Sequence, residues 1–170
     1  MNIRLQALSE SDGQEIYEMI REMGQGENGF RTNFPEDDYD QFKAALPRLM
    51  EVSKGIDMPE GYVPQTIYWM YADERPVAYG KLRHRLTDQL LEYGGHIGYS
   101  IRPSERGKGY GKLFLSELLK EAARLNLDKV LITCDEDNIR SRRVAEANGG
   151  KLEGIKDGHC KYWLPTSKEA

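Results

Sequence analysis

The sequence has few cysteines, no long apolar run and no excess of positive charge. Its 170 residues include only two cysteines, Cys134 and Cys160, too few for a disulfide framework or a cysteine-rich metal site. No stretch approaches the roughly 20 apolar residues that span a membrane, and the N-terminus lacks the apolar core of a secretion signal. The formal charge is −4, without a dense basic run. We therefore expect one cytoplasmic domain over residues 1–170, without metal, membrane or nucleic-acid partners.

A glycine-rich stretch stands out between Arg102 and Phe114, which reads RPSERGKGYGKLF. Glycine lets a ligand approach the main chain closely, and the first amides of a helix carry the positive end of its dipole. The apolar spacing after this stretch predicts a helix, so the turn is a candidate cradle for a phosphate. Two phosphate motifs fail on spacing: Leu113 follows Gly111-Lys112 where a Walker A loop needs Ser or Thr, and Lys112 occupies the sixth position of a dinucleotide fingerprint. The residues that would form the cradle are Arg106, Gly107, Lys108, Gly109, Tyr110, Gly111 and Lys112.

The order of the expected elements predicts an α/β (α+β) fold. Early strands joined by hairpins and later strands joined by helices imply a mixed central sheet of about six or seven strands with helices on both faces. The strand at 96–101, the helix after the glycine turn and the strand at 129–134 form a βαβ unit. Ser9 or Ser11 is expected to cap the first helix, and 24–35 is expected to be a surface loop or a lid. The expected strands are 2–7, 66–71, 77–85, 96–101, 129–134, 151–155 and 159–163, and the other expected helices are 9–23, 37–54 and 138–148.

Two strings resemble the motifs of one known family. The string IRPSERGKGYG, from Ile101 to Gly111, is similar to the acyl-CoA-binding signature of the GNAT (Gcn5-related) N-acetyltransferases, Gln/Arg-x-x-Gly-x-Gly/Ala. The string NIRSRRVAEANGG, from Asn138 to Gly150, resembles that family's second motif, Asn-x-x-Ala/Ser-x-x-Leu-Tyr. The two motifs occur in the family's order and cover 95–150.

The resemblance implies acetyl-CoA as co-substrate and no metal. It places the CoA diphosphate on the amides between Arg106 and Gly111, and the pantetheine arm along the strand that ends at Ile101. It places Asn138, with Ser141 in the same motif, near the thiol end of the cofactor. From the residue type alone, Asn138 is also an ordinary helix cap. The implied cofactor-binding residues are thus Ile101, Arg106, Gly107, Lys108, Gly109, Tyr110, Gly111, Lys112, Asn138 and Ser141.

The resemblance implies an N-acetyltransferase in which a primary amine attacks the thioester directly in a ternary complex. The family's base position corresponds to His96, whose ordinary pKa suits a base at neutral pH, and Glu92 is the second candidate. The family's tyrosine acid corresponds to Ala145, so another residue or a water must act. The acceptor is expected to be a small-molecule or peptide amine, and the protein a monomer or homodimer.

Alternatives remain open for the function and for two other groups of residues. The missing tyrosine motivates a non-catalytic acyl-CoA sensor of the same fold, and the glycine turn alone motivates a nucleotide binder of a different fold. Arg83-His84-Arg85 is either a carboxylate site or a solvated strand end. Cys134 is expected in the core, with the wall of the site as its alternative.

Overall fold

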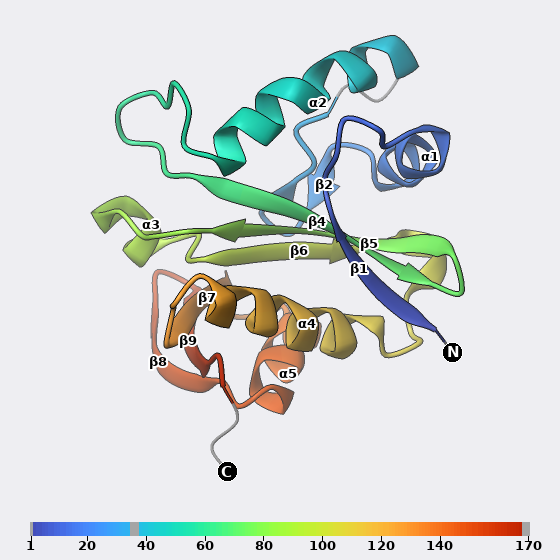
Figure 1. Cartoon of the computed structure of the whole chain (residues 1–170). Coiled ribbons are helices and arrows are strands. Elements are labelled where there is room, and N and C mark those ends of the chain that lie inside the picture. Colours follow the sequence, from blue (N-terminus) through green and yellow to red (C-terminus); the bar gives the residue numbers. More distant parts are fainter. Residues whose placement is uncertain (1, 35–37, 168–170) are drawn as a thin grey trace.

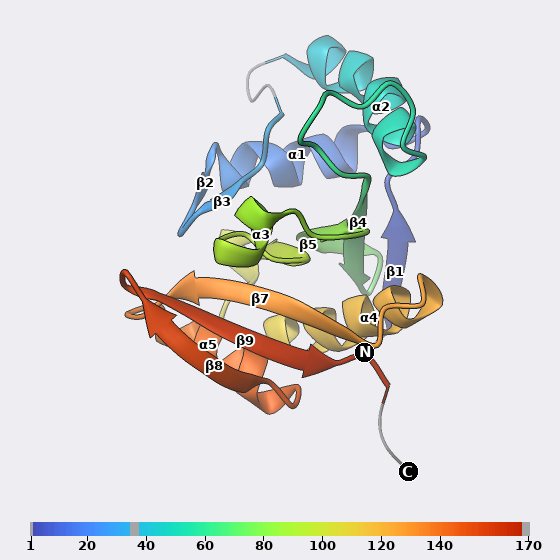
Figure 2. The ribbon, with the colours of Figure 1, turned by 90° about the vertical axis from the view of Figure 1, so that its left-hand side faces the viewer.

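The protein is described by a computed structural model that covers residues 2–34 and 38–167. Its strands form two larger antiparallel sheets and one small hairpin, as Figures 1 and 2 show. The first sheet has the order β1-β4-β5-β6, the second has the order β7-β9-β8, and β2 pairs with β3. The strands are β1 Ile3–Ala7, β2 Gly26–Glu27, β3 Phe30–Arg31, β4 Gln65–Ala72, β5 Arg75–Arg83, β6 Ile97–Ile101, β7 Lys129–Asp135, β8 Lys151–Lys156 and β9 His159–Pro165. The helices are α1 Gln14–Met23, α2 Tyr39–Ser53, α3 Asp88–Glu92, α4 Tyr110–Arg124 and α5 Ile139–Ala147, with a 3₁₀ turn at Pro103–Glu105.

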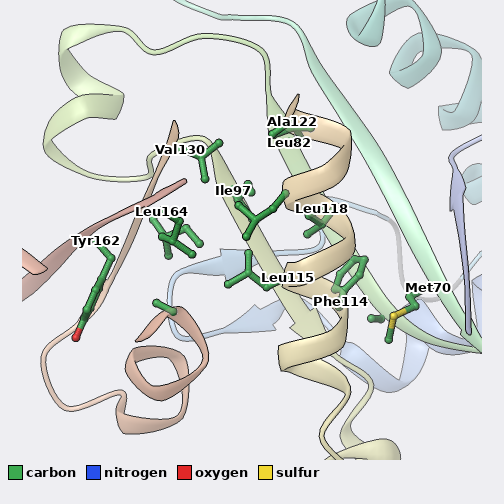
Figure 3. Packing of buried hydrophobic residues seen from close by; sticks show 14 of the residues in the cluster. Met70, Leu82, Ile97, Phe114, Leu115, Leu118, Ala122, Val130, Tyr162 and Leu164 are labelled. Atoms are coloured by element: carbon green, nitrogen blue, oxygen red, sulfur yellow. The ribbon is translucent and has the colours of Figure 1, made fainter. Parts of the chain in front are cut away.

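Helices cover both faces of the first sheet (Figure 1). Helices α1 and α2 pack on one face around buried Trp69 and Tyr79, which have 0 % exposure. Helix α4 packs on the other face and fills the space between the two sheets with buried side chains that include Phe114 and Leu118 (Figure 3). Gly80 allows this approach, because a Cβ there would lie 2.6 Å from Phe114 Cζ. The expected α/β class with helices on both faces is therefore confirmed.

The sheet differs from the expected one because it is divided between β6 and β7. These neighbouring strands meet at one junction, where His96 N–H donates to Leu131 O at 2.8 Å and Leu131 N–H donates to His96 Nδ1 at 2.9 Å. Gly95 has a φ of +61°, and a Cβ there would lie 2.3 Å from Leu131 O, so only glycine fits this junction. Beyond the junction, β6 pairs with β5 alone within the described residues. The outer edge of β6 is therefore open.

Several local predictions change in the structure. The first helix begins at Gln14 after Gly13, and neither Ser9 nor Ser11 caps it, because Asp12 Oδ2 accepts from Ser9 N–H at 2.8 Å and closes a turn before the helix. The expected loop at 24–35 contains the β2–β3 hairpin, although its residue 35 lies outside the described residues. The start of the second helix at residue 37 also lies outside them, and the described helix α2 runs without interruption through Pro47. The short helix α3 was not predicted.

Candidate functional site

The glycine turn between β6 and α4 has the backbone form that its sequence predicts. Gly107 and Gly109 have φ values of +80° and +84°, and Gly109 precedes the first residue of α4 in the left-handed region. A Cβ at either glycine would meet nothing within 4 Å, so the turn faces open space. In the described part of the chain, no group accepts a hydrogen bond from the N–H of Gly107, Lys108 or Gly109. Together with the free amides of the first helical turn, these donors make a positive cradle for an anion.

A cavity of about 340 Å³ lies beside this turn, and we call it the turn cavity. Its walls come from β6, the glycine turn, the start of α5 and the β2–β3 hairpin. All the expected cofactor-binding residues line it except Lys108, whose Nζ donates instead to Glu105 Oε2 at 2.8 Å. Arg106 forms an ion pair with Glu27 of the hairpin, so the hairpin is tied to the turn. The basic residues among its walls are Arg106, Lys112, Arg140 and Arg143.

Asn138 serves as a helix cap and also lines the cavity. Its Oδ1 accepts from Ser141 N–H at 3.3 Å at the start of α5. Ser141 and Tyr99 line the same two cavities. Burial raises the pKa of Tyr99 to about 12, so this phenol keeps its proton at neutral pH. The structure thus places a protonated hydroxyl of β6 beside the residues of the second sequence motif.

A second cavity of about 110 Å³ continues from the first, and we call it the inner cavity. Its walls include residues of both β6 and β7, so it occupies the gap between the two sheets, and Cys134 is one of them. It also reaches Lys81 and Arg83 on β5. The residues common to both cavities are Asn28, Phe30, Tyr99, Asn138 and Ser141. A ligand on the glycine turn can therefore extend along β6 into the gap.

His96 lies in the junction between the sheets and lines neither cavity. It is 6 % exposed, and burial together with the charge of Arg83 lowers its pKa to about 4. Because Nδ1 accepts from Leu131 N–H, the neutral ring carries its proton on Nε2 and has no free lone pair. This geometry opposes the expected role of His96 as a base and gives it a role in holding β6 to β7.

Glu92, the other candidate base, and most of the basic cluster Arg83-His84-Arg85 also lie outside the two cavities. Glu92 lines neither cavity, and its exposed carboxylate pairs with Lys156 Nζ at 3.3 Å. Within the basic cluster, Arg83 lines the inner cavity, whereas His84 Nε2 is 2.8 Å from Thr66 Oγ1 and Arg85 is exposed. The three residues thus do not share one environment, since Arg83 faces a cavity and Arg85 faces solvent.

Sequence reasoning missed two residues that line the cavities, Lys81 and Tyr99. Lys81 is the one charged residue in the run PVAYGKL between the arginines at the two ends of β5, and that isolated charge was the available signal. Tyr99 lies in the expected strand at 96–101, but nothing in the sequence shows that the sheet opens beside it. Within the described residues, no helix is long and apolar enough to cross a membrane, and no group of three or more potential metal ligands occurs.

The glycine turn and the two cavities lie where the first and second sheets separate. The protein thus has an α/β fold with an anion-binding turn beside the gap between its sheets. The chain matches the acetyltransferase (GNAT) domain family over residues 2–151 and therefore belongs to the GNAT acetyltransferases. A comparison with curated proteins gives no match.

Solved structures with this fold include several acetyltransferases. A putative acetyltransferase, yncA, from Salmonella typhimurium with its cofactor acetyl-CoA is 16 % identical, with a TM-score of 0.61 over 99 % of this chain and 96 % of that one. The N-acetyltransferase PseH of Campylobacter jejuni, in complex with acetyl coenzyme A, is 14 % identical, with a TM-score of 0.64 over 98 % and 100 %. A Salmonella typhimurium acetyltransferase that modifies the N-terminal serine of ribosomal protein L7/L12 is 17 % identical, with a TM-score of 0.67 over 97 % and 95 %.

Proposed function

We propose that this protein transfers the acetyl group of acetyl-CoA to a primary amine by direct attack in a ternary complex. The observation that carries the proposal is the set of unpaired N–H groups at Gly107, Lys108 and Gly109, directly before helix α4. Such a cradle suits a diphosphate, which CoA carries, and the chain belongs to an acetyltransferase family. The basic side chains of the turn cavity would add charge-assisted contacts to the same group.

The open edge of β6 supports the position of the pantetheine arm. Arg102 N–H donates to Val77 O on β5 at 2.7 Å, and backbone groups alternate in direction along a strand. The N–H groups of Tyr99 and Ile101 therefore point to the unpaired edge, where an extended amide-containing arm can add as a further strand. We assign the Ile101 amide as the donor that stabilises negative charge on the thioester oxygen during attack.

Tyr99 is the proton donor that we assign to the departing thiolate. It lines both cavities together with Ser141, and its raised pKa keeps it protonated at neutral pH. Ala145, at the family's tyrosine position, is only 1 % exposed and carries no hydroxyl. Tyr99 on β6 can therefore supply the proton that Ala145 on α5, at the family's tyrosine position, cannot supply.

The charge of the inner cavity favours the neutral form of the attacking amine. Its described lining contains no carboxylate and no imidazole, and it contains the buried or half-buried cations of Lys81 and Arg83 as well as the exposed Arg31. Nearby positive charge lowers the pKa of an ammonium group. The acceptor amine can therefore lose its proton to water without a dedicated base in the cavity, and then attack the thioester carbon.

Binding and turnover are tested with the intact protein. Acetyl-CoA at 100 times its dissociation constant should stabilise the fold by about 2.7 kcal/mol in thermal unfolding, whereas ATP and NAD should have no effect. Release of free CoA thiol should then depend on an added primary amine. Acetyl-CoA binding without turnover of any amine would favour the sensor alternative, and no binding of acetyl-CoA would refute both.

A further inference from the structure

We propose that the acceptor amine is a small molecule that also carries an anionic group, a carboxylate in the first instance, which is held by Lys81 and Arg83. This inference rests on the proposed acetyl transfer and specifies its substrate class. The two cations project from the same face of β5 into the inner cavity, close to the gap where the thioester would lie.

Lys81 is a buried cation without an acidic partner in the described structure. Its side chain belongs to a residue with 6 % exposure, and its Nζ donates to Arg31 O at 2.5 Å. The same nitrogen lies 5.0 Å from the ring centre of Phe30 and 5.7 Å from that of Tyr79. Burial and the charge of Arg83 lower its pKa to about 8, so it still carries its charge at neutral pH.

Arg83 adds a second cation that is also matched only by neutral groups. Its Nη1 is 3.3 Å from Gly94 O and 3.2 Å from Gly95 O. These two carbonyls belong to the segment that joins the sheets, so the guanidinium is fixed at the end of the cavity. Burial lowers its pKa, which shows that its charge is partly removed from water.

The lining of the inner cavity contains no Asp or Glu among the residues that the structure describes. Buried charges in proteins are usually paired, because an isolated one loses its hydration without compensation. This chain follows that rule elsewhere, since Arg102 is 7 % exposed and pairs with Glu22 Oε1 at 2.9 Å. Lys81 and Arg83 have no such acidic partner among the described residues. This indicates that a bound ligand supplies the negative charge that pairs with them.

The geometry links this anion to the amine that reacts. The inner cavity of about 110 Å³ holds roughly four water molecules' share of volume, enough for a carboxylate and a short connector. One anion on two cations leaves a net positive charge facing the amine, which still favours its neutral form. The acceptor class is therefore a compact amino acid rather than a simple alkylamine or a polyamine.

The experiment compares acceptors that differ in one charge. The twenty L-amino acids and their carboxamides, together with β-alanine, phosphoethanolamine and propylamine, are assayed with acetyl-CoA by release of free thiol. We expect kcat/KM to be about 10- to 100-fold higher for an amino acid than for its carboxamide, the factor of a charge-assisted hydrogen bond. A preference for phosphoethanolamine over β-alanine would overturn the assignment of a carboxylate.

Matched variants connect this preference to the two cations. K81M and R83Q should each lower kcat/KM for the preferred amino acid by about 10- to 100-fold more than for its carboxamide, and should leave acetyl-CoA affinity unchanged. R85Q, which removes an exposed charge two residues away, should change neither. Acetyl-CoA binding with equal or better use of uncharged amines, or with no use of any anionic one, would overturn the inference and leave acetyl-CoA binding in place. No binding of acetyl-CoA would overturn the proposed function itself.

Discussion

Acid should weaken the junction between the two sheets through His96, and this effect has a calculable size. The folded protein lowers the pKa of His96 from 6.5 to about 4. The unfolded chain therefore binds this proton more tightly, so the contribution to stability is complete above pH 6.5 and is lost as the pH falls towards 4. At about 1.4 kcal/mol for each pKa unit, the loss amounts to about 3 kcal/mol.

The substitution H96N isolates this contribution from the carboxylates that titrate in the same range. Asparagine cannot take up the proton, yet its side-chain oxygen can still accept from Leu131 N–H. At pH 7.5 we expect the variant to be less stable by about 1–3 kcal/mol, because the packing and hydrogen bond are imperfect. The stability of wild type should then fall by about 3 kcal/mol relative to the variant between pH 7.5 and 4, so that at pH 4 the variant is as stable as wild type or more stable.

Urea unfolding at a series of pH values measures both quantities, and H159N is the matched control. His159 lies on β9, and its Nδ1 is 3.0 Å from Asp135 Oδ1 on a partly exposed surface. The control leaves His96 in place, so the loss of stability that protonation of His96 causes should remain. A constant difference between wild type and H96N across this pH range would refute the argument for a buried neutral imidazole.

The same variant decides whether His96 acts as the base. If it only joins the strands, kcat/KM of folded H96N at pH 7.5 should stay within about threefold of wild type, and the acid limb of the pH profile should not move. A loss of 100-fold or more in a folded variant would fall in the range of general-base catalysis and would restore the catalytic role.

Two further predictions concern the glycine turn and the proton donor. G109A and G158A place the same Cβ strain at φ values of +84° and +78° in open space, so each should cost about 1–2 kcal/mol of stability, but only G109A should weaken CoA binding in calorimetry. Equal CoA affinity in both variants would exclude the turn as the diphosphate site. Y99F should lower kcat by about 100-fold with little change in acetyl-CoA affinity, whereas Y68F, which removes a phenol with a similarly raised pKa of about 12 outside the cleft, should change neither. Unchanged kcat in Y99F would reject it as the acid.

The succession of β6, the glycine turn, α4 and β7 could be predicted because its signals are local, although its two strands belong to different sheets. Glycine spacing, the apolar period of α4 and the short apolar strand from Lys129 each depend on a few neighbouring residues. The asparagine at 138 was likewise placed correctly at a helix start, where its side chain caps Ser141 N–H.

The division of the sheet and the chemistry of the gap could not be predicted in this way. His96 is the first residue of the expected strand at 96–101, but in the structure it lies in an irregular junction that depends on Leu131, 35 positions away. The pairing of Lys81 with a carbonyl of Arg31, 50 positions away, is equally non-local. Sequence patterns indicate which face of a helix or strand is buried, whereas this site depends on how the edges of β6 and β7 separate.

The gap between the sheets also shapes how the chain can assemble. Hairpin β4–β5 of the first sheet and hairpin β8–β9 of the second sheet each pair residues that are near in sequence. We therefore expect each hairpin to form early and independently of the other. The junction at His96 and Leu131 joins them across a longer loop and closes later. A molecule bound in the gap would contact both halves at once, so we expect its binding to stabilise the folded chain against separation of the two halves.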